Sequence, residues 1–217
     1  MKSGTVGGGA WLTGRMGEIT LVRHGETEWS ASRRHTSYTD LDLTPDGERQ
    51  ARALGGVLGG WRFARVLSSP RTRALRTAQL AGLAVTATDP DLAEWNYGEY
   101  EGRTTADIQA DRPGWDIWTD GCPGGESPAE VGERLDRVLG RIAALLDSGD
   151  VALVGHAHSL RVLGARWIGL PPAAGGRLRL DTATVSVLGH EHGRRVIQRW
   201  NQSAPPPPGA DASAARH

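Results

Sequence analysis

The sequence predicts an α/β fold, because short apolar segments typical of buried strands alternate with longer segments of helical periodicity. Two predicted strands, residues 19–22 and 151–154, are each followed by a polar break that contains a histidine. A predicted helix between them carries its apolar residues on one stripe, as a helix that covers a sheet does. Since open α/β sheets bind ligands at the carboxyl ends of their strands, we expect His24 and His156 to face one crevice.

After the first predicted strand, the first half of the chain contains a helix, a second strand and a further helix. Thr44 is a favourable N-cap and Pro45 suits the first helical position, so a helix is predicted from residue 45 to about residue 58. Residues 66–67 form a short apolar strand. Ser69 follows it closely and is predicted to cap the next helix.

The second half of the chain opens with a long amphipathic helix. Ser127 and Glu130 form a capping box at its start. Its apolar stripe is Val131, Leu135, Val138, Leu139, Ile142, Leu145 and Leu146. The remaining predicted elements are the strand at residues 151–154, a helix at about 158–168, strands at 184–188 and 196–200, and a turn at 191–193.

Composition favours a one-domain enzyme and excludes several other classes. The length of 217 residues suits one domain with a sizeable core. Because 25 basic residues balance 25 acidic ones, we predict no nucleic-acid partner. No apolar run approaches the ~20 residues that span a bilayer, so no membrane partner is predicted. The single cysteine, Cys122, rules out an intramolecular disulfide and is compatible with a cytoplasmic location.

Three regions are predicted along the chain. Residues 1–16 contain three consecutive glycines and no convincing signal core, so they are predicted to be a flexible N-terminal extension. Residues 17–201 form the one globular domain. Residues 202–217 are rich in proline and alanine and are predicted to be a disordered tail.

The tripeptide Arg23-His24-Gly25 supplies groups that phosphoryl transfer requires. The transferring group needs a nucleophile in line, cationic donors on its equatorial oxygens and an acid for the leaving oxygen. His24 provides the nucleophile and Arg23 a donor, while Gly25 lets backbone N–H groups approach a phosphate closely. Arg73, in the first turn of a predicted helix, adds a second guanidinium. Taken singly, each of these residues has an ordinary structural alternative.

The tripeptide Arg23-His24-Gly25, the segment 68–74 with Arg73, Glu94 and His156, in this order, resemble the histidine phosphatase superfamily, also called the phosphoglycerate mutase-like fold. The resemblance covers about residues 18–200, nearly the whole globular part. The segments that carry it are residues 21–29, 43–47, 69–74, Glu94 and residues 154–161. The resemblance implies a three-layer α/β/α sandwich with a mostly parallel central sheet.

The resemblance also implies a catalytic role for each matching residue. His24 is the nucleophile that becomes transiently phosphorylated, and Glu94 is the proton donor. Arg23, Arg73 and His156 form the phosphate pocket. The chemistry fits, because His24 must be neutral to attack and neighbouring cations push its pKa down. In the second half-reaction a water deprotonated by Glu94 attacks the phosphohistidine.

Further substrate contacts are implied with less direct matches. Ser30 stands where the family usually has asparagine, and its hydroxyl can still donate. Thr36 matches a residue that the mutases use near the phosphate, and His158 replaces a mutase asparagine. Tyr97, with Trp95, Trp115 and Trp118, would wall a sugar phosphate pocket, although such aromatic residues are at least as often core or lid packing.

A missing set of cations favours hydrolysis over mutase chemistry. The mutases hold a carboxylated phosphoglycerate with an arginine pair and a lysine downstream of the acid residue. Here that stretch is residues 98–103, and the only lysine in the chain is Lys2. Residues 115–127 instead resemble the phosphatase branch, which includes broad acid phosphatases and sedoheptulose bisphosphatase-like enzymes. We therefore predict a phosphomonoester hydrolase acting on small phosphorylated metabolites such as sugar phosphates, with a cofactor-dependent phosphoglycerate mutase as the alternative.

Other classes fit the sequence less well. A non-catalytic phosphate-binding module would be expected to lack part of the catalytic set, and the set is complete. A cysteine phosphatase would need arginine six positions after Cys122, where the chain has proline. The pairs His156 with His158 and His190 with His192 have metal-binding spacings, but phosphate contacts and an exposed turn explain them better, so we predict no metal and no cofactor. The predicted partner is a small-molecule phosphate ester, and relatives in the family leave a homodimer or a homotetramer as the expected assembly.

Overall fold

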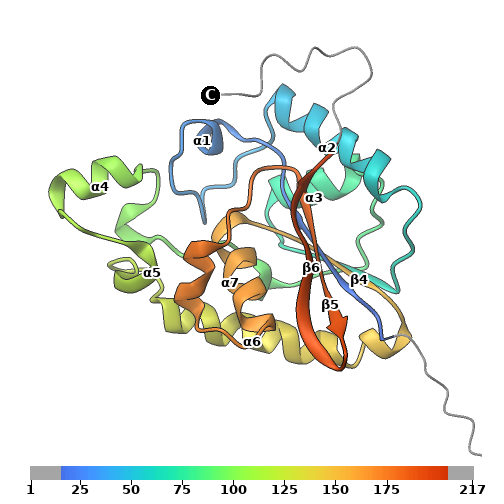
Figure 1. Ribbon diagram of the computed structural model, residues 1–217. Helices are drawn as coiled ribbons and strands as arrows, with labels where there is room; N and C mark the ends of the chain where they lie inside the picture. Colours follow the sequence, from blue (N-terminus) through green and yellow to red (C-terminus); the bar gives the residue numbers. More distant parts are fainter. Residues whose placement is uncertain (1–15, 205–217) are drawn as a thin grey trace, which may run out of the picture.

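The computed structural model describes residues 16–204, which form a six-stranded sheet between helices (Figure 1). The strands are β1 Ile19–Arg23, β2 Arg65–Ser68, β3 Ala87–Thr88, β4 Val151–Gly155, β5 Thr184–Glu191 and β6 Arg194–Ser203. Their order is β3-β2-β4-β1-β5-β6, with the first four parallel and the last two antiparallel to their neighbours. The predicted α/β fold with a mostly parallel central sheet is confirmed.

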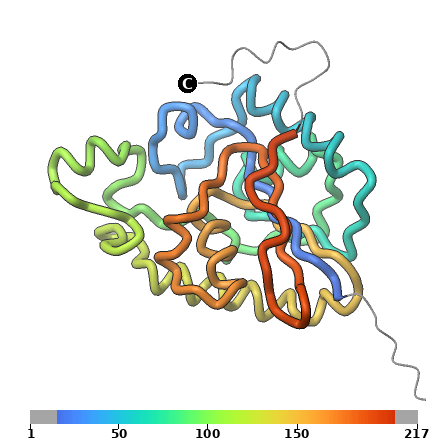
Figure 2. The backbone as a smooth tube through the Cα atoms, in the orientation of Figure 1, coloured from blue at the N-terminus to red at the C-terminus, as the bar shows by residue number. Residues whose placement is uncertain are grey.

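Helices cover both faces of this sheet. They are α1 Glu28–Ala31, α2 Pro45–Leu58, α3 Thr72–Leu80, α4 Thr105–Asp111, α5 Ile117–Asp120, α6 Pro128–Ala143 and α7 Ala157–Trp167, with short 3₁₀ turns at Pro90–Leu92, Gly98–Tyr100, Leu146–Ser148 and Pro172–Arg177. Figure 1 shows α2 and α3 on one side of the sheet and α6 and α7 on the other. The segment with α4 and α5, green in Figure 2, extends to one side of the sheet.

Alternate residues of the central strands divide the core into two layers. Ile19 and Leu21 of β1 pack in the cluster that contains α6 and α7, whereas Val22 packs in the cluster that contains α2 and α3. The same alternation holds along β4, where every residue is buried. Strands covered on both faces are apolar throughout, which is why both segments read as continuous apolar runs in the sequence.

The helix starts agree with the predicted caps at two of three positions. Thr44 caps α2 by accepting the N–H of Gly47 at 3.0 Å, and Ser127 and Glu130 form the capping box of α6. The predicted cap at Ser69 is wrong, because α3 begins at Thr72 with Arg71 as its N-cap. The Ser69 hydroxyl is bonded to a buried histidine instead, as described below.

The C-terminal hairpin is longer than predicted. Thr184 of β5 pairs with Ser203 of β6, so the sheet continues two residues past the predicted domain boundary at residue 201. This corrects the start of the predicted tail, because backbone pairing orders residues 202 and 203. The rest of that tail and residues 1–15 of the predicted extension lie outside the described residues. Within residues 16–204, no helix combines the length and the apolar character needed to cross a membrane.

Candidate active site

Three polar residues follow the ends of neighbouring parallel strands. Arg23 of β1 lies opposite Gly155 of β4, so His24 and His156 leave the sheet side by side. Ser69 follows β2 on the other side of β4 and donates its N–H to Val154. The sheet register therefore brings these three side chains to one end of the sheet. The two apolar runs with their polar breaks predicted this for His24 and His156, but not for Ser69.

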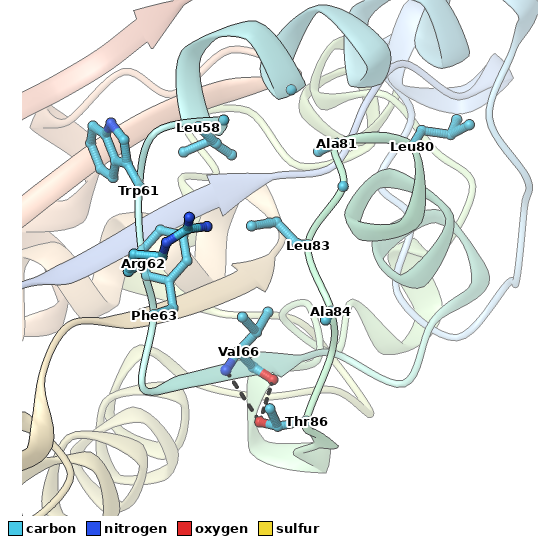
Figure 3. Close-up of a pocket in the computed structure, with 13 residues that line it drawn as sticks. Leu58, Trp61, Arg62, Phe63, Val66, Leu80, Ala81, Leu83, Ala84 and Thr86 are labelled. Atoms are coloured by element: carbon cyan, nitrogen blue, oxygen red, sulfur yellow. Dashed lines mark hydrogen bonds between the residues drawn. The ribbon is translucent and has the colours of Figure 1, made fainter.

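A cavity of about 410 Å³ opens over His24 and Glu94. A larger groove of about 550 Å³ lies elsewhere, between the ends of α2 and α3 and the start of β2 (Figure 3). Its lining is mainly apolar, and its polar side chains, Arg62 and Thr86, do not belong to the predicted site. The smaller cavity is the candidate active site because three of the predicted catalytic residues, Arg23, His24 and Glu94, line it.

The His24 ring is held in one tautomer. Its Nδ1 lies 2.7 Å from the carbonyl oxygen of Gly25, which can only accept, so Nδ1 carries the proton and Nε2 carries the lone pair. Burial lowers the pKa of His24 well below its ordinary value of 6.5, and the charges of Arg73 and Arg23 lower it further. The direction agrees with the sequence-based expectation, although burial is the largest cause. A neutral imidazole with a free Nε2 is a competent nucleophile.

Arg23 has a donor left over for an anion. One terminal nitrogen donates to the carbonyl oxygen of Leu180, whereas the buried Nε has no acceptor among the described residues. A buried N–H without a partner is costly and normally finds one. Arg23 lines the cavity beside His24, so a residue at the candidate site keeps hydrogen-bonding capacity that the described residues do not use.

Arg73 and His156 lie directly behind His24 and are fully buried. The Nε–H of Arg73 donates to Nδ1 of His156 at 3.2 Å. Neutral His156 therefore carries its proton on Nε2, which lies 2.7 Å from the Ser69 hydroxyl. The pKa of His156 is lowered well below 6.5, first by burial and then by Arg73. These two residues lie behind His24 and do not line the cavity. This corrects the expectations that His156 faces the same crevice as His24 and that both residues line the phosphate pocket.

Glu94 is held at the start of α7. Its Oε1 accepts the N–H groups of Trp95 at 2.9 Å and Ser159 at 2.8 Å, while Oε2 accepts that of His158 at 3.1 Å. Arg134, in turn, donates to the backbone carbonyls of residues 91, 93 and 94 and so anchors the loop that carries this carboxyl group. The less engaged oxygen, Oε2, is the one that can carry and release a proton into the cavity.

Neutral aromatic groups form one wall of the cavity. The Tyr97 hydroxyl lies 2.7 Å from Nδ1 of His158, and the rings of His35 and Tyr97 are 4.6 Å apart. Burial lowers the pKa of His35 to about 4 and that of His158 well below 6.5, and it raises the pKa of Tyr97. This wall therefore offers uncharged hydrogen-bonding groups at neutral pH.

Three predicted substrate contacts are engaged within the protein. Gly25 does not line the cavity: its N–H donates to Thr77, and a Cβ there would lie 2.5 Å from the carbonyl oxygen of Gly47. Gly25 therefore serves close packing, which corrects the predicted approach of its N–H to phosphate. Ser30 lines the cavity, but its hydroxyl donates to the Thr27 carbonyl oxygen in the cap of α1. The Thr36 hydroxyl, also at the cavity, bonds a backbone carbonyl.

The three tryptophans that were expected either to wall the pocket or to fill the core take different positions. Trp95 and Trp115 are core residues, each donating its indole N–H to a backbone carbonyl. Trp118 is partly buried, and its ring lies 4.4 Å from the Arg161 guanidinium that lines the cavity. Of the four aromatic residues that were expected either to wall the pocket or to fill the core, only Tyr97 reaches the cavity.

Several cavity residues were missed by the sequence analysis. They are Arg33, Arg34, His35, Thr105, Arg161 and Asp181. The pair Arg33-Arg34 was visible as adjacent cations, and the structure places both at the exposed rim, with Arg33 in a left-handed conformation at φ 59°. Arg134 gave no local signal, because its ion pair with Glu126 and its carbonyl contacts form only in the folded chain.

Comparison with known proteins places this geometry in a family. A family model described as the histidine phosphatase superfamily (branch 1) matches residues 19–203. An acid phosphatase of Mycobacterium tuberculosis is 44% identical over 164 residues, which cover 75% of this chain and 81% of that protein. A sedoheptulose 1,7-bisphosphatase of Saccharomyces cerevisiae is 38% identical over 183 residues, covering 69% and 67%. A solved structure of an open reading frame from Mycobacterium tuberculosis superposes with a TM-score of 0.85 at 42% identity, covering 88% of this chain and 100% of that one.

Proposed function

The chain belongs to the histidine phosphatase superfamily, and we propose that it hydrolyses phosphate monoesters of small metabolites, sugar phosphates among them, through a phosphohistidine on His24. The relatives named as phosphatases support hydrolysis. The observation that carries the proposal is the state of His24: Nδ1 is tied to a carbonyl, Nε2 is unbound among the described residues, and the ring borders the cavity.

In the first step, Nε2 of His24 attacks the phosphorus atom. The new P–N bond forms as the ester P–O bond breaks, and Oε2 of Glu94 gives its proton to the leaving oxygen. The unpartnered Nε–H of Arg23 offsets negative charge on the equatorial oxygens. The buried charge of Arg73 adds to this field from behind the ring.

In the second step, the phosphoenzyme is hydrolysed. Glu94, now without its proton, accepts one from a water molecule as that water attacks phosphorus. The P–N bond breaks, inorganic phosphate leaves, and His24 returns to its neutral form. One carboxyl group thus serves as acid and then as base.

A phosphoglycerate mutase is the second candidate, because the cavity has more cations than the sequence indicated. Arg33, Arg34 and Arg161 line it in addition to Arg23. Such a rim could hold the second anionic group of a phosphoglycerate or of a bisphosphate. Interconversion of 2- and 3-phosphoglycerate faster than phosphate release would favour the mutase.

We propose that catalysis needs neither a metal nor a cofactor, because the named side chains supply the nucleophile, the acid and the cationic donors. Full activity in EDTA is the expected result, and loss of activity that a divalent ion restores would contradict it. A cytoplasmic location is proposed on the basis of the lone Cys122. A homodimer or homotetramer stays a prediction, to be checked by light scattering.

The proposed function is tested by trapping the phosphoenzyme. We expect enzyme that is mixed with a sugar phosphate and quenched in alkali, where the P–N bond is stable, to gain the mass of one phosphoryl group on a peptide containing His24. We expect His24→Ala to release no phosphate. His192→Asn is the matched control, because this exposed histidine lies in the β5–β6 turn. Normal turnover in His24→Ala, or a phosphoryl group on another residue, would overturn the nucleophile assignment.

A further inference from the structure

We infer that Glu101 is a positioning residue for phosphoryl transfer: its carboxylate holds the loop of residues 36–39 so that the loop's carbonyl groups orient Arg73 against His156. This inference rests on the proposed function and deepens it. Glu101 lies outside the cavity lining, so its effect has to pass through the loop and Arg73.

The first link is the clasp between Glu101 and the loop. Its two oxygens accept the N–H of Ser37 at 2.9 and 3.0 Å, the Ser37 hydroxyl at 2.9 Å and the N–H of Thr39 at 3.1 Å. Within residues 16–204, no arginine or lysine forms an ion pair with this carboxylate. In this part of the chain, the hydrogen bonds to the carboxylate therefore all come from residues 37 and 39 of the loop, three from backbone N–H groups and one from the Ser37 hydroxyl.

The second link joins the same stretch to Arg73. The terminal nitrogens of Arg73 donate to the carbonyl oxygens of Thr36 at 3.1 Å, Ser37 at 3.3 Å and Thr39 at 3.1 Å. The N–H groups of residues 37 and 39 thus bond Glu101, while their carbonyls bond Arg73. The loop is a layer of oriented peptide groups between an anion and a cation.

Arg73 depends on these carbonyls because its terminal nitrogens have no other close hydrogen-bond acceptor among the described residues. It is fully buried, and the nearest carboxylate, that of Asp40, is 4.0 Å from one terminal nitrogen. A buried guanidinium without hydrogen-bond acceptors is strongly unfavourable. If the loop shifted, Arg73 would have to follow its carbonyl acceptors or lose them.

The third link reaches the reacting groups. With its terminal nitrogens held, Arg73 directs its Nε–H to His156 at 3.2 Å, and the His156 ring lies 5.1 Å from that of His24. The charge of Arg73 also helps to keep both histidines neutral, after burial itself. A displaced guanidinium would weaken this effect and the field that a transferring phosphoryl group meets.

The fold around the loop does not depend on the Glu101 carboxylate alone. His35, which directly precedes the loop, is also joined to residues 102 and 103 by backbone bonds, from its N–H to the Arg103 carbonyl at 2.9 Å and from the Gly102 N–H to its carbonyl at 2.8 Å. Those bonds do not involve the carboxylate, so Glu101→Gln is expected to fold. An amide in place of the carboxylate turns an NH₂ group toward a donor on the loop and breaks part of the clasp.

The experiment compares Glu101→Gln, Glu101→Asp and the matched control Glu99→Gln. Glu99 is exposed, lies two residues away in the same connection and does not line the candidate active-site cavity. For each variant we would measure the pH profile of kcat/KM with nitrophenyl phosphate and the affinity for inorganic phosphate by calorimetry. Thermal unfolding would check the fold.

For Glu101→Gln we expect kcat/KM to fall roughly 10- to 100-fold, the size of effect that a misplacement of about 1 Å produces. We expect its acid limb to move to higher pH, since the pKa of His24 rises as Arg73 moves away, and phosphate to bind more weakly. For Glu101→Asp, which keeps a carboxylate, we expect the acid limb of kcat/KM to lie between that of the wild type and that of Glu101→Gln. The profile of Glu99→Gln should match that of the wild type.

An unshifted acid limb and unchanged phosphate affinity in Glu101→Gln, with or without a lower unfolding temperature, would overturn the inference. If Glu101→Gln fails to fold, the same criteria apply to Glu101→Asp. The proposed function fails separately, if the wild type binds phosphate but hydrolyses no ester. Phosphate affinity that still depended on Glu101 in that case would support the positioning role.

Discussion

The rings of His24 and His156 lie 5.1 Å apart between centroids and meet at an angle of 62°. Their nitrogens are engaged in opposite ways, because His24 bonds a carbonyl through Nδ1 whereas His156 accepts from Arg73 through Nδ1. The two imidazoles are therefore opposite tautomers, and only His24 has a free Nε2 at the cavity. This difference favours His24 over His156 as the nucleophile in the proposed mechanism.

The loss of kcat/KM on removing the proposed acid, Glu94, should depend on the leaving group. We expect Glu94→Gln to lower kcat/KM roughly 100- to 10,000-fold with alkyl phosphates, because an alkoxide needs a proton to depart. With nitrophenyl phosphate the loss should be mild, since nitrophenolate leaves without one. Steady-state phosphate release with both substrates checks this, and equal losses would argue against an acid role for Glu94.

The pH profile should report a nucleophile that stays neutral in acid. Only unprotonated His24 attacks, so kcat/KM falls as the pH drops through its pKa in the folded enzyme. Burial, Arg73 and Arg23 set that pKa well below 6.5. We therefore expect no loss of kcat/KM from His24 protonation near pH 6.5, with the acid limb appearing only well below it. An acid limb centred at 6.5 would show that the ring is more exposed than the structure indicates.

Folding stability should fall in acid, partly through His35. The pKa of His35 is about 4 in the folded state against an ordinary value of 6.5, so the unfolded chain binds more protons between these pH values. The free energy of unfolding should therefore decrease as the pH falls from 6.5 to about 4. The His35 share is about 3 kcal/mol, at about 1.4 kcal/mol per pKa unit. Urea titrations should show a shallower pH dependence for His35→Gln, and an unchanged dependence would contradict this assignment.

The exposed rim should discriminate among substrates by charge. We expect Arg33→Ala to raise KM roughly fivefold for a sugar bisphosphate, which corresponds to the ~1 kcal/mol of a solvent-exposed ion pair. The KM for nitrophenyl phosphate, which has no second anionic group, should stay the same. This internal comparison needs no second variant, and equal changes in both KM values would place Arg33 outside the substrate contacts.

The elements predicted correctly are those whose signals are local. Thr44, Ser127 and Glu130 satisfy N–H groups within three residues of themselves, so their caps could be identified from the sequence. The cap predicted at Ser69 was wrong because its hydroxyl bonds His156, which is 87 residues away. The capping propensity of Ser69 was overridden by a hydrogen bond to a residue that only the folded sheet brings near.

The sequence by itself determined where the central strands end and which reactive side chains follow them, because an apolar run and the polar break after it lie within a few consecutive residues. The tertiary structure alone decided how those side chains are used. In the folded chain the N–H of Gly25 donates to Thr77, and His24 bonds a carbonyl through Nδ1, which leaves its Nε2 free. Glu101 and Arg73 both bond the loop that lies between them. Each hydrogen-bonding group can satisfy few partners, and the competition among them is settled only when distant segments meet.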